Sequence, residues 1–302
     1  MITVFGSINV DFVTRVDHIP AAGETVLGPD YQVFAGGKGG NQALAAARAG
    51  AQVRMVGAVG DDPFAPIGTA QLSHAGVDLS GLVRTQAPTG AAFIAVSAEG
   101  ENAIVVASGA NRTASARQLE TRSFGPQDLL LVQRELDDRE TCNAMRHAKA
   151  HGARVILNAA PAHGMTRDWL SCLDYLIVNE GEITDLGSIL GLSHKDPDAL
   201  AQQIAADHQI TVIVTLGPEG CIGWSDGIRR ALPALSVSVV DTTAAGDSFC
   251  GAFAAALDQG MGLTGALQHG IAAGSLACQT LGAQSSIPDK EAITTALAGH
   301  FV

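Results

Sequence analysis

Short runs of apolar, largely β-branched residues alternate along this chain with longer segments of helical pattern. Several of these runs are apolar at every position, as parallel strands must be when helices cover both faces of their sheet. The alternation predicts an α/β fold, a doubly wound and mainly parallel sheet with helices on both faces. The predicted strands are 2–5, 53–59, 129–133, 155–158, 175–178, 212–216 and 236–240. The predicted helices are 40–49, 63–75, 138–151, 179–190, 197–208, 247–258, 263–281 and 289–299.

Two regions break this alternation. Residues 11–34 alternate in polarity like strands, and residues 90–107 have the pattern of a hairpin with its turn at 98–102. They predict one small β-sheet inserted over a ligand site, and two extra edge strands of the main sheet are the alternative. With no linker or repeat, residues 1–302 are expected to form a single domain that carries these two lid segments.

Composition limits the class of protein. The chain has 302 residues, of which 47% are hydrophobic and 16% charged, which fits a folded α/β enzyme. A net charge of −12 argues against binding to nucleic acid or to an anionic membrane. No apolar run is long enough for a membrane span, and the chain opens on a strand without a signal peptide, so a cytoplasmic protein is expected. The five cysteines are widely spaced, which predicts reduced thiols.

The segment Asp241-Thr-Thr-Ala-Ala-Gly-Asp247 carries the most chemistry, because it is expected to end a strand and to lead into an apolar helix that begins at Asp247. The small residues Ala244, Ala245 and Gly246 would leave backbone N–H groups uncovered at the helix N-terminus, which is an anion site. Asp247 places a carboxylate at the same point. This combination suits a phosphoryl group on the N–H groups while Asp247 accepts a proton from an attacking hydroxyl. An aspartate that only stabilises the helix is the alternative.

A second glycine-rich turn, Gly36-Gly-Lys-Gly-Gly-Asn-Gln42, opens an alanine-rich helix near the start of the chain. It is not a Walker A loop, because Gly39 follows Lys38 where that loop needs Ser or Thr. No G-x-G-x-x-G motif follows the first strand, which disfavours dinucleotide binding. Two turns of this kind, one with a candidate base and one with the polar groups of Lys38 and Asn41, suggest sites for two substrates.

Together these two turns resemble the two signatures of the ribokinase-like (PfkB) carbohydrate kinases. Further matches follow in the family's order at 6–11, 20–25, 179–182 and 215–220. The resemblance implies a β lid, a homodimer formed through the lid, and ATP-dependent phosphorylation of the terminal hydroxyl of a small sugar, with D-ribose expected. Another kinase of the family, for fructose, deoxyribose, a ketodeoxy sugar acid or a nucleoside, is the alternative. A non-catalytic sugar or nucleotide sensor is less expected, because a sensor needs no base.

The resemblance also implies a role for each matching residue. Catalysis is expected at Asp247 with the turn residues Ala244, Ala245 and Gly246. Sugar binding is implied for Asn9, Asp11, Gly37, Lys38, Asn41, Glu135 and Asp247. ATP binding is implied for Asn179, Thr215, Gly217, Gly220 and Gly246. Mg²⁺ would be positioned, largely through water, by Asn179 and Glu182. An activating monovalent cation, K⁺, would be bound by Asp241, Thr243, Ala277, Thr280, Gly282 and Ser286.

Some of these residues also have simpler interpretations. Asn9 and Asp11 suit a turn, Asn179 and Glu182 suit a helix N-terminus, and glycine after a strand is common in turns. Only 4% of the residues are aromatic, and the predicted lid offers Phe12, Tyr31, Phe34 and Phe93. A nucleoside kinase would be expected to stack its base on such rings, so Phe12 or Phe93 facing the site would weaken the assignment to a sugar.

Overall fold

The computed structural model describes residues 1–121 and 123–300. Nine strands form the main sheet in the order β13-β12-β11-β10-β9-β8-β1-β4-β5, parallel from β5 to β11. The strands are β1 (Ile2–Phe5), β4 (Val53–Gly60), β5 (Asp78–Thr85), β8 (Leu129–Val132), β9 (Arg154–Asn158), β10 (Tyr175–Asn179), β11 (Thr211–Thr215), β12 (Cys221–Ser225) and β13 (Ile228–Leu232). The predicted α/β class with a mainly parallel sheet is confirmed.

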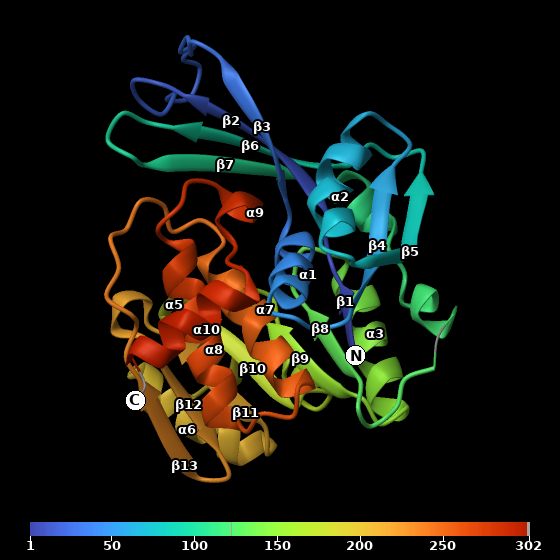
Figure 1. Ribbon diagram of the computed structural model, residues 1–302, viewed down its shortest axis with the longest axis vertical. Helices are drawn as coiled ribbons and strands as arrows, with labels where there is room; N and C mark the ends of the chain where they lie inside the picture. The colour runs from blue at the N-terminus through green and yellow to red at the C-terminus, as the bar shows by residue number, and fades with distance from the viewer. Residues whose placement is uncertain (122, 301–302) are drawn as a thin grey trace.

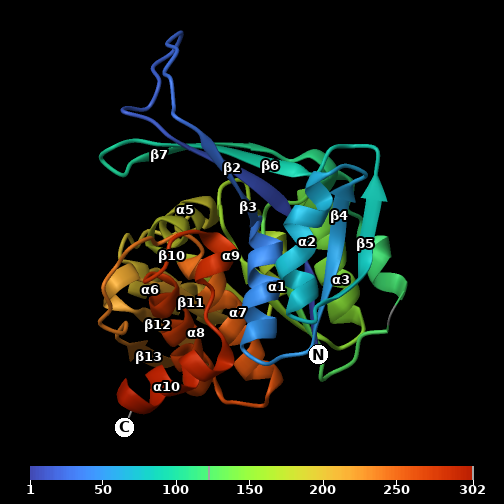
Figure 2. The same ribbon diagram turned by 45° about the horizontal axis from the view of Figure 1, so that its top comes forward.

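Helices cover both faces of this sheet (Figures 1 and 2). They are α1 (Lys38–Arg48), α2 (Phe64–His74), α3 (Asp138–Ala150), α4 (Arg167–Leu170), α5 (Glu180–Leu190), α6 (Pro197–His208), α7 (Ala245–Asp258), α8 (Leu263–Ala277), α9 (Ala283–Ser286) and α10 (Lys290–His300), with 3₁₀ turns at Gly109–Thr113, Ala116–Thr121 and Gly217–Glu219. β8 is apolar at every position because both of its faces are buried. Leu129 and Leu131 pack into one core with α1 and α7, and Leu130 and Val132 pack into the other core with α3. Among the described residues, no helix combines the length and apolar character needed to cross a bilayer.

A second, four-stranded sheet stands over one end of the main sheet (Figure 2). Its order is β3-β2-β6-β7, from β2 (Asn9–Arg15), β3 (Tyr31–Gly36), β6 (Gly90–Val96) and β7 (Asn102–Ala107). β2 and β6 pair in parallel, and the outer pairs are antiparallel. The small separate sheet is therefore confirmed, and the alternative of two extra edge strands of the main sheet is wrong. We call this sheet the lid.

The predicted strand at 236–240 is wrong. Val239 and Val240 are 64% and 62% exposed, and this segment joins neither sheet. Its backbone instead bonds to the residue that follows α8: the N–H groups of Val240 and Asp241 both donate to the carbonyl oxygen of Cys278, at 2.8 and 3.2 Å. The predicted helix 263–281 ends at Ala277, so that the following turn reaches Asp241. Asp241 therefore follows an extended segment held by the end of α8.

Three strands of the main sheet, β5, β12 and β13, were not predicted. The hairpin β12–β13 has a recognisable signal, because Asp226 and Gly227 join two runs rich in apolar residues and Asp-Gly favours a two-residue hairpin turn. Both residues adopt positive φ, 53° and 73°, as such a turn requires. β5 gives a weaker signal, since it is an edge strand with irregular burial.

Candidate active site

A pocket of about 230 Å³ lies where β9, β10 and β11 end and α7 begins. This is the carboxyl edge of the parallel strands, where α/β sheets bind their ligands. The pocket brings together seven of the predicted residues: Lys38, Asn179, Glu182, Thr215, Ala244, Gly246 and Asp247. Asn158, Thr242 and Cys250 also line it, and sequence reasoning missed them.

The anion turn lies at the N-terminus of α7, and this helix begins two residues earlier than predicted. The helix begins at Ala245, so Asp247 is its third residue and not its first. Ala244 precedes it with φ of 59°, a conformation that alanine adopts at a cost. The N–H of Ala245 donates to the carbonyl oxygen of Thr242 at 3.2 Å. Within the described chain no side chain caps this end, so the N–H groups of Gly246 and Asp247 remain available to an anion.

Two consecutive residues of α1 hold the carboxylate of Asp247, which is 8% exposed. Nδ2 of Asn41 donates to Oδ2 at 2.9 Å, and Nε2 of Gln42 donates to Oδ1 at 2.9 Å. Amide donors on both oxygens fix the orientation of the carboxylate. A fixed carboxylate beside an anion site can act as a general base toward a hydroxyl group.

Lys38, the first residue of α1, supplies a positive charge among several carboxylates. Burial alone would lower the pKa of Lys38, but the negative charges of Asp247, Glu135 and Glu182 outweigh it and raise the pKa above its usual value. The ammonium is therefore held charged at the boundary between the pocket and the lid. A buried cation in this place can balance the negative charge of a phosphoryl group.

Asp11 and Glu135 lie close enough for their charges to interact. Burial raises the pKa of Asp11, on lid strand β2, to about 7, and the negative charges of Glu135 and Asp247 add to the effect. Glu135 follows β8, and its Oε2 accepts hydrogen bonds from Oγ of Ser7 at 2.6 Å and from the N–H of Lys38 at 3.0 Å. The three acids thus surround the start of α1. Ser7, which fixes Glu135, was not predicted.

The turn into α1 depends on close backbone contact. Gly37 has φ of 86°, and a Cβ at this position would lie 2.7 Å from the backbone nitrogen of Asn9. Asn9 is buried, and its Oδ1 accepts a hydrogen bond at 2.7 Å from Nδ2 of Asn111. Asn111 also bonds to the N–H and the carbonyl of Ile8, at 3.0 and 3.1 Å. It therefore fixes Asn9 where the chain passes from β1 into the lid, a role that no local pattern reveals.

Some of the residues predicted to bind the nucleotide and Mg²⁺ line the pocket, and others do not. Asn179 and Glu182 form a capping box at the start of α5, with Oδ1 of Asn179 and Oε2 of Glu182 each accepting a backbone N–H at 2.8 Å. Both line the pocket as well, so the helix-terminus and ligand interpretations are compatible. Thr215 lines the pocket, but Gly217 and Gly220 do not. A Cβ on Gly220 would clash with the carbonyl of Leu232, which explains this glycine by packing.

The residues predicted to bind a monovalent cation come from two segments that Asp241 joins. Its Oδ1 accepts from the N–H and the hydroxyl of Thr243, at 2.9 and 2.6 Å, and its Oδ2 from the N–H of Gly282 at 2.8 Å. Burial would raise the pKa of Asp241, but these hydrogen bonds outweigh it and lower the pKa. Thr280 bonds back to Ala277 and Ser286 to Ala283. Across the described residues, no three His, Cys, Asp or Glu side chains gather as a metal site.

The aromatic rings of the lid mostly lie away from Asp11. Phe12 follows Asp11 in β2, so it faces the opposite side of the sheet. It stacks on Phe93 at 5.5 Å and contacts Phe64 of α2 at 5.3 Å, between ring centres. Phe34 is paired directly with Asp11 and shares its face. Neither Phe12 nor Phe93 therefore faces the site.

An anion site at a helix N-terminus, beside a fixed carboxylate and beneath a β lid, is the arrangement of a small-molecule kinase. The chain belongs to the pfkB family of carbohydrate kinases, whose family model matches residues 1–290. It is 37% identical over 297 residues to a ribokinase of Haemophilus influenzae, with 96% of each chain covered. A ribokinase structure from Thermotoga maritima matches with a TM-score of 0.91 and 35% identity, over 98% of this chain and 99% of that one. A ribokinase of Arabidopsis thaliana, solved with ribose and ATP, matches with a TM-score of 0.86 and 28% identity over 98% of both chains.

Proposed function

We propose that this chain transfers the terminal phosphoryl group of ATP to the terminal hydroxyl of D-ribose, giving D-ribose 5-phosphate and ADP. One observation carries the proposal. The carboxylate of Asp247, in the first turn of α7, accepts hydrogen bonds from the side chains of Asn41 and Gln42 on α1. The whole-length similarity to ribokinases, one of them solved with ribose and ATP, supports the choice of substrates.

In this mechanism Asp247 takes the proton of the sugar hydroxyl as its oxygen attacks the terminal phosphorus. A new P–O bond forms to the sugar, the bond to the bridging oxygen breaks, and ADP leaves. The N–H groups of Gly246 and Asp247 and the ammonium of Lys38 stabilise the charge on the transferred group. Positioning and electrostatics supply most of the rate, because phosphoryl transfer asks for little covalent chemistry from the protein.

Sugar binding would use the polar groups gathered between the lid and α1. They are the backbone turn at Gly37 and the side chains of Asn9, Asp11, Lys38, Asn41 and Glu135. Phe12 and Phe93 lie on the other side of the lid, which favours a polyol over a nucleoside. Sites built around hydroxyl groups reject analogues that lack them, because buried polar partners are left unpaired.

The proposed reaction includes two cations. Asn179 and Glu182, which both line the pocket, would position Mg²⁺ largely through water, and Oε1 of Glu182, the carboxylate oxygen that the capping box does not use, could accept hydrogen bonds from its water ligands. Mg²⁺ would neutralise the phosphate oxygens when bound. The loop fixed by Asp241 would hold K⁺ through oxygens of Asp241, Thr243, Ala277, Thr280, Gly282 and Ser286. There K⁺ would order the segment that leads into the anion turn.

The active form is proposed to be a homodimer built through the lid. All of β7 is exposed, including Ile104, Val105 and Val106 at 53%, 67% and 49%. An exposed apolar edge strand is an aggregation hazard unless another chain covers it.

An assay of ADP release, with ATP and a panel of ribose, deoxyribose, fructose and adenosine, tests the proposal. Ribose should have the highest kcat/KM, and adenosine or fructose in its place would overturn the assignment to ribose. Asp247→Asn should lower kcat by about 10²–10⁴-fold and leave sugar binding largely intact. Asp207→Asn, an exposed position on α6, is the matched control. A kcat of Asp247→Asn within a few-fold of the unaltered enzyme would remove Asp247 from the mechanism.

A further inference from the structure

Gln42 is fully buried and joins the candidate base to the pocket wall. Its Nε2 carries two hydrogens, and it donates to Oδ1 of Asp247 at 2.9 Å and to Oδ1 of Asn158 at 3.0 Å. Its Oε1 accepts from Nε2 of Gln133, at the end of β8, at 2.7 Å. Gln42 itself does not line the pocket. It therefore acts on any substrate through Asp247 and Asn158.

The network allows one orientation of the Gln42 amide. If the amide turned over, its oxygen would face the oxygens of Asp247 and Asn158. Asn158 is fixed in the same sense, because its Nδ2 donates to the carbonyl of Ile177 at 3.3 Å. Both hydrogens of Nε2 and the oxygen Oε1 of Gln42 have partners, so losing one of these bonds leaves a buried polar group unpaired at a cost.

Each carboxylate oxygen of Asp247 thus accepts one hydrogen bond, from Asn41 or from Gln42. Of these two donors, a bound sugar could contact only Asn41. Asn41 belongs to the proposed sugar site and can exchange its bond to Asp247 for one to the sugar. Gln42 lies behind, shielded from ligand, and its bond to Oδ1 can persist through the reaction. We propose that Gln42 is a positioning residue for phosphoryl transfer, which holds the Asp247 carboxylate in one rotamer against the pocket. This inference rests on the proposed role of Asp247 as the base.

Two substitutions of similar shape separate this role from packing. Gln42→Met removes every hydrogen bond and keeps the side-chain length. Gln42→Glu still accepts from Gln133, but it cannot donate to Asp247 and places a like charge beside it.

With ribose and ATP saturating, Gln42→Met should lower kcat about 10- to 100-fold and leave the sugar KM within about threefold. The acid limb of its kcat–pH profile should move up by about one pH unit, because a charged group has lost a donor. Gln42→Glu should move that limb further.

Gln71→Met is the matched control, because Gln71 on α2 is half-buried and bonds to Arg48 at 3.2 Å. Its kcat and acid limb should not change. If Gln42 only packs, both Gln42 variants will lose thermal stability, yet the kcat per folded molecule and the acid limb will match the unaltered enzyme. That result overturns the inference. If Asp247→Asn keeps its kcat, the proposed base fails first, so the two failures are distinguishable.

A measurement on the unaltered protein covers the case in which the variants do not fold. The NMR signals of the Gln42 side-chain amide should shift as pH is lowered and Asp247 takes up a proton. The shift should be absent from Asp247→Asn. Signals of Gln42 that do not respond to pH would overturn the inference.

Discussion

At the scale of single residues, the site concentrates negative charge around one ammonium group. The charges of Glu135 and Asp247 raise both the pKa of Asp11 and the pKa of Lys38. Asp247 and Glu135 are each supported by hydrogen-bond donors. Asp11 responds most strongly to its surroundings, because burial and the two neighbouring carboxylates all raise its pKa, to about 7. The lid therefore carries a group that changes charge near neutral pH.

This makes sugar binding dependent on pH. Below its pKa of about 7, Asp11 is protonated in the sugar-free protein and has lost capacity to accept hydrogen bonds from hydroxyl groups. We expect the ribose KM, measured with ATP saturating, to rise about tenfold between pH 8 and pH 6, because only the charged form binds well. Asp11→Asn should raise the KM and abolish its dependence on pH in this interval. A KM that is constant from pH 8 to pH 6 would contradict the prediction.

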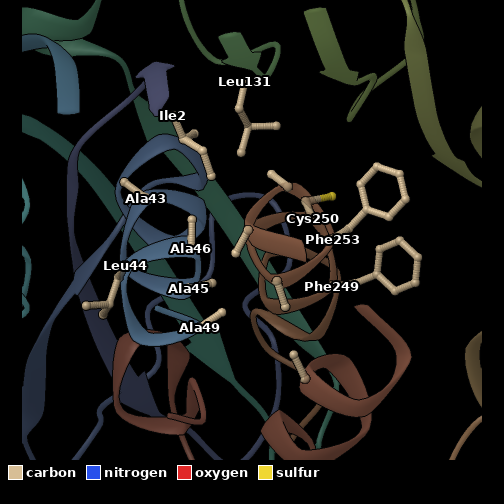
Figure 3. Close-up of a cluster of buried hydrophobic side chains, with 14 of the residues drawn as sticks. Ile2, Ala43, Leu44, Ala45, Ala46, Ala49, Leu131, Phe249, Cys250 and Phe253 are labelled. Atoms are coloured by element: carbon tan, nitrogen blue, oxygen red, sulfur yellow. The ribbon is translucent and has the colours of Figure 1, made fainter. Parts of the chain in front are cut away.

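At the scale of elements, the position of the base depends on how closely α1 and α7 approach. Both helices present small residues to one another (Figure 3). A Cβ at Gly251 of α7 would lie 2.4 Å from the Cβ of Ala45 and 2.6 Å from the carbonyl of Gln42. The close contact brings Asp247 within reach of Asn41 and Gln42, so this packing and the chemistry of the site are linked.

Gly251→Ala should therefore separate the two helices. We expect the free energy of unfolding to fall by about 1–3 kcal/mol from overpacking, together with a lower kcat. Gly265→Ala is the control, because a Cβ there would meet Met261 at an ordinary 3.5 Å. Inside α8 that change should stabilise the protein by about 0.5–1 kcal/mol. Urea unfolding of both variants measures the difference, and equal stabilities would contradict the packing argument.

The two segments that carry the predicted cation residues, one before α7 and one after α8, should make activity depend on K⁺. Asp241 holds them together, because its carboxylate accepts hydrogen bonds from Thr243 in the first segment and from Gly282 in the second. We expect kcat in K⁺ to exceed kcat in an organic cation, at equal ionic strength, by about fivefold or more. Asp241→Asn should remove most of this difference. Equal rates in the two buffers would count against a cation site.

Local pattern predicted most elements but not how distant segments meet. The apolar runs gave most of the parallel strands, whereas 236–240 has strand-like polarity and lacks a neighbour with which to pair. The Asp-Gly turn of β12–β13 is a local hairpin signal, although the predicted strands do not include this hairpin. In the site, Lys38, Asn41 and Asp247 stand in recognisable motifs. Gln42 has partners 91 to 205 residues away, so only the folded structure reveals its network.

At the scale of the whole molecule, the lid exposes apolar side chains that no other part of the described chain covers. Figure 2 shows it extending beyond the body of the protein. β7 is its free edge, and Val105 is paired with Phe93, which is paired with Phe12. These three side chains share the face opposite Asp11, so a partner chain could cover them without entering the sugar site.

We therefore expect a homodimer through the lid. Light scattering at micromolar concentration should give about twice the chain mass of 30.9 kDa. Val105→Lys places a charge on a side chain that is 67% exposed and points away from Asp11, so it should yield a folded monomer. Its ribose KM should rise, because the lid loses the support of its partner. Ile228→Lys, on the exposed edge strand β13 of the main sheet, should remain a dimer. A monomeric unaltered protein, or a dimer that Val105→Lys leaves intact, would show that the lid is not the interface.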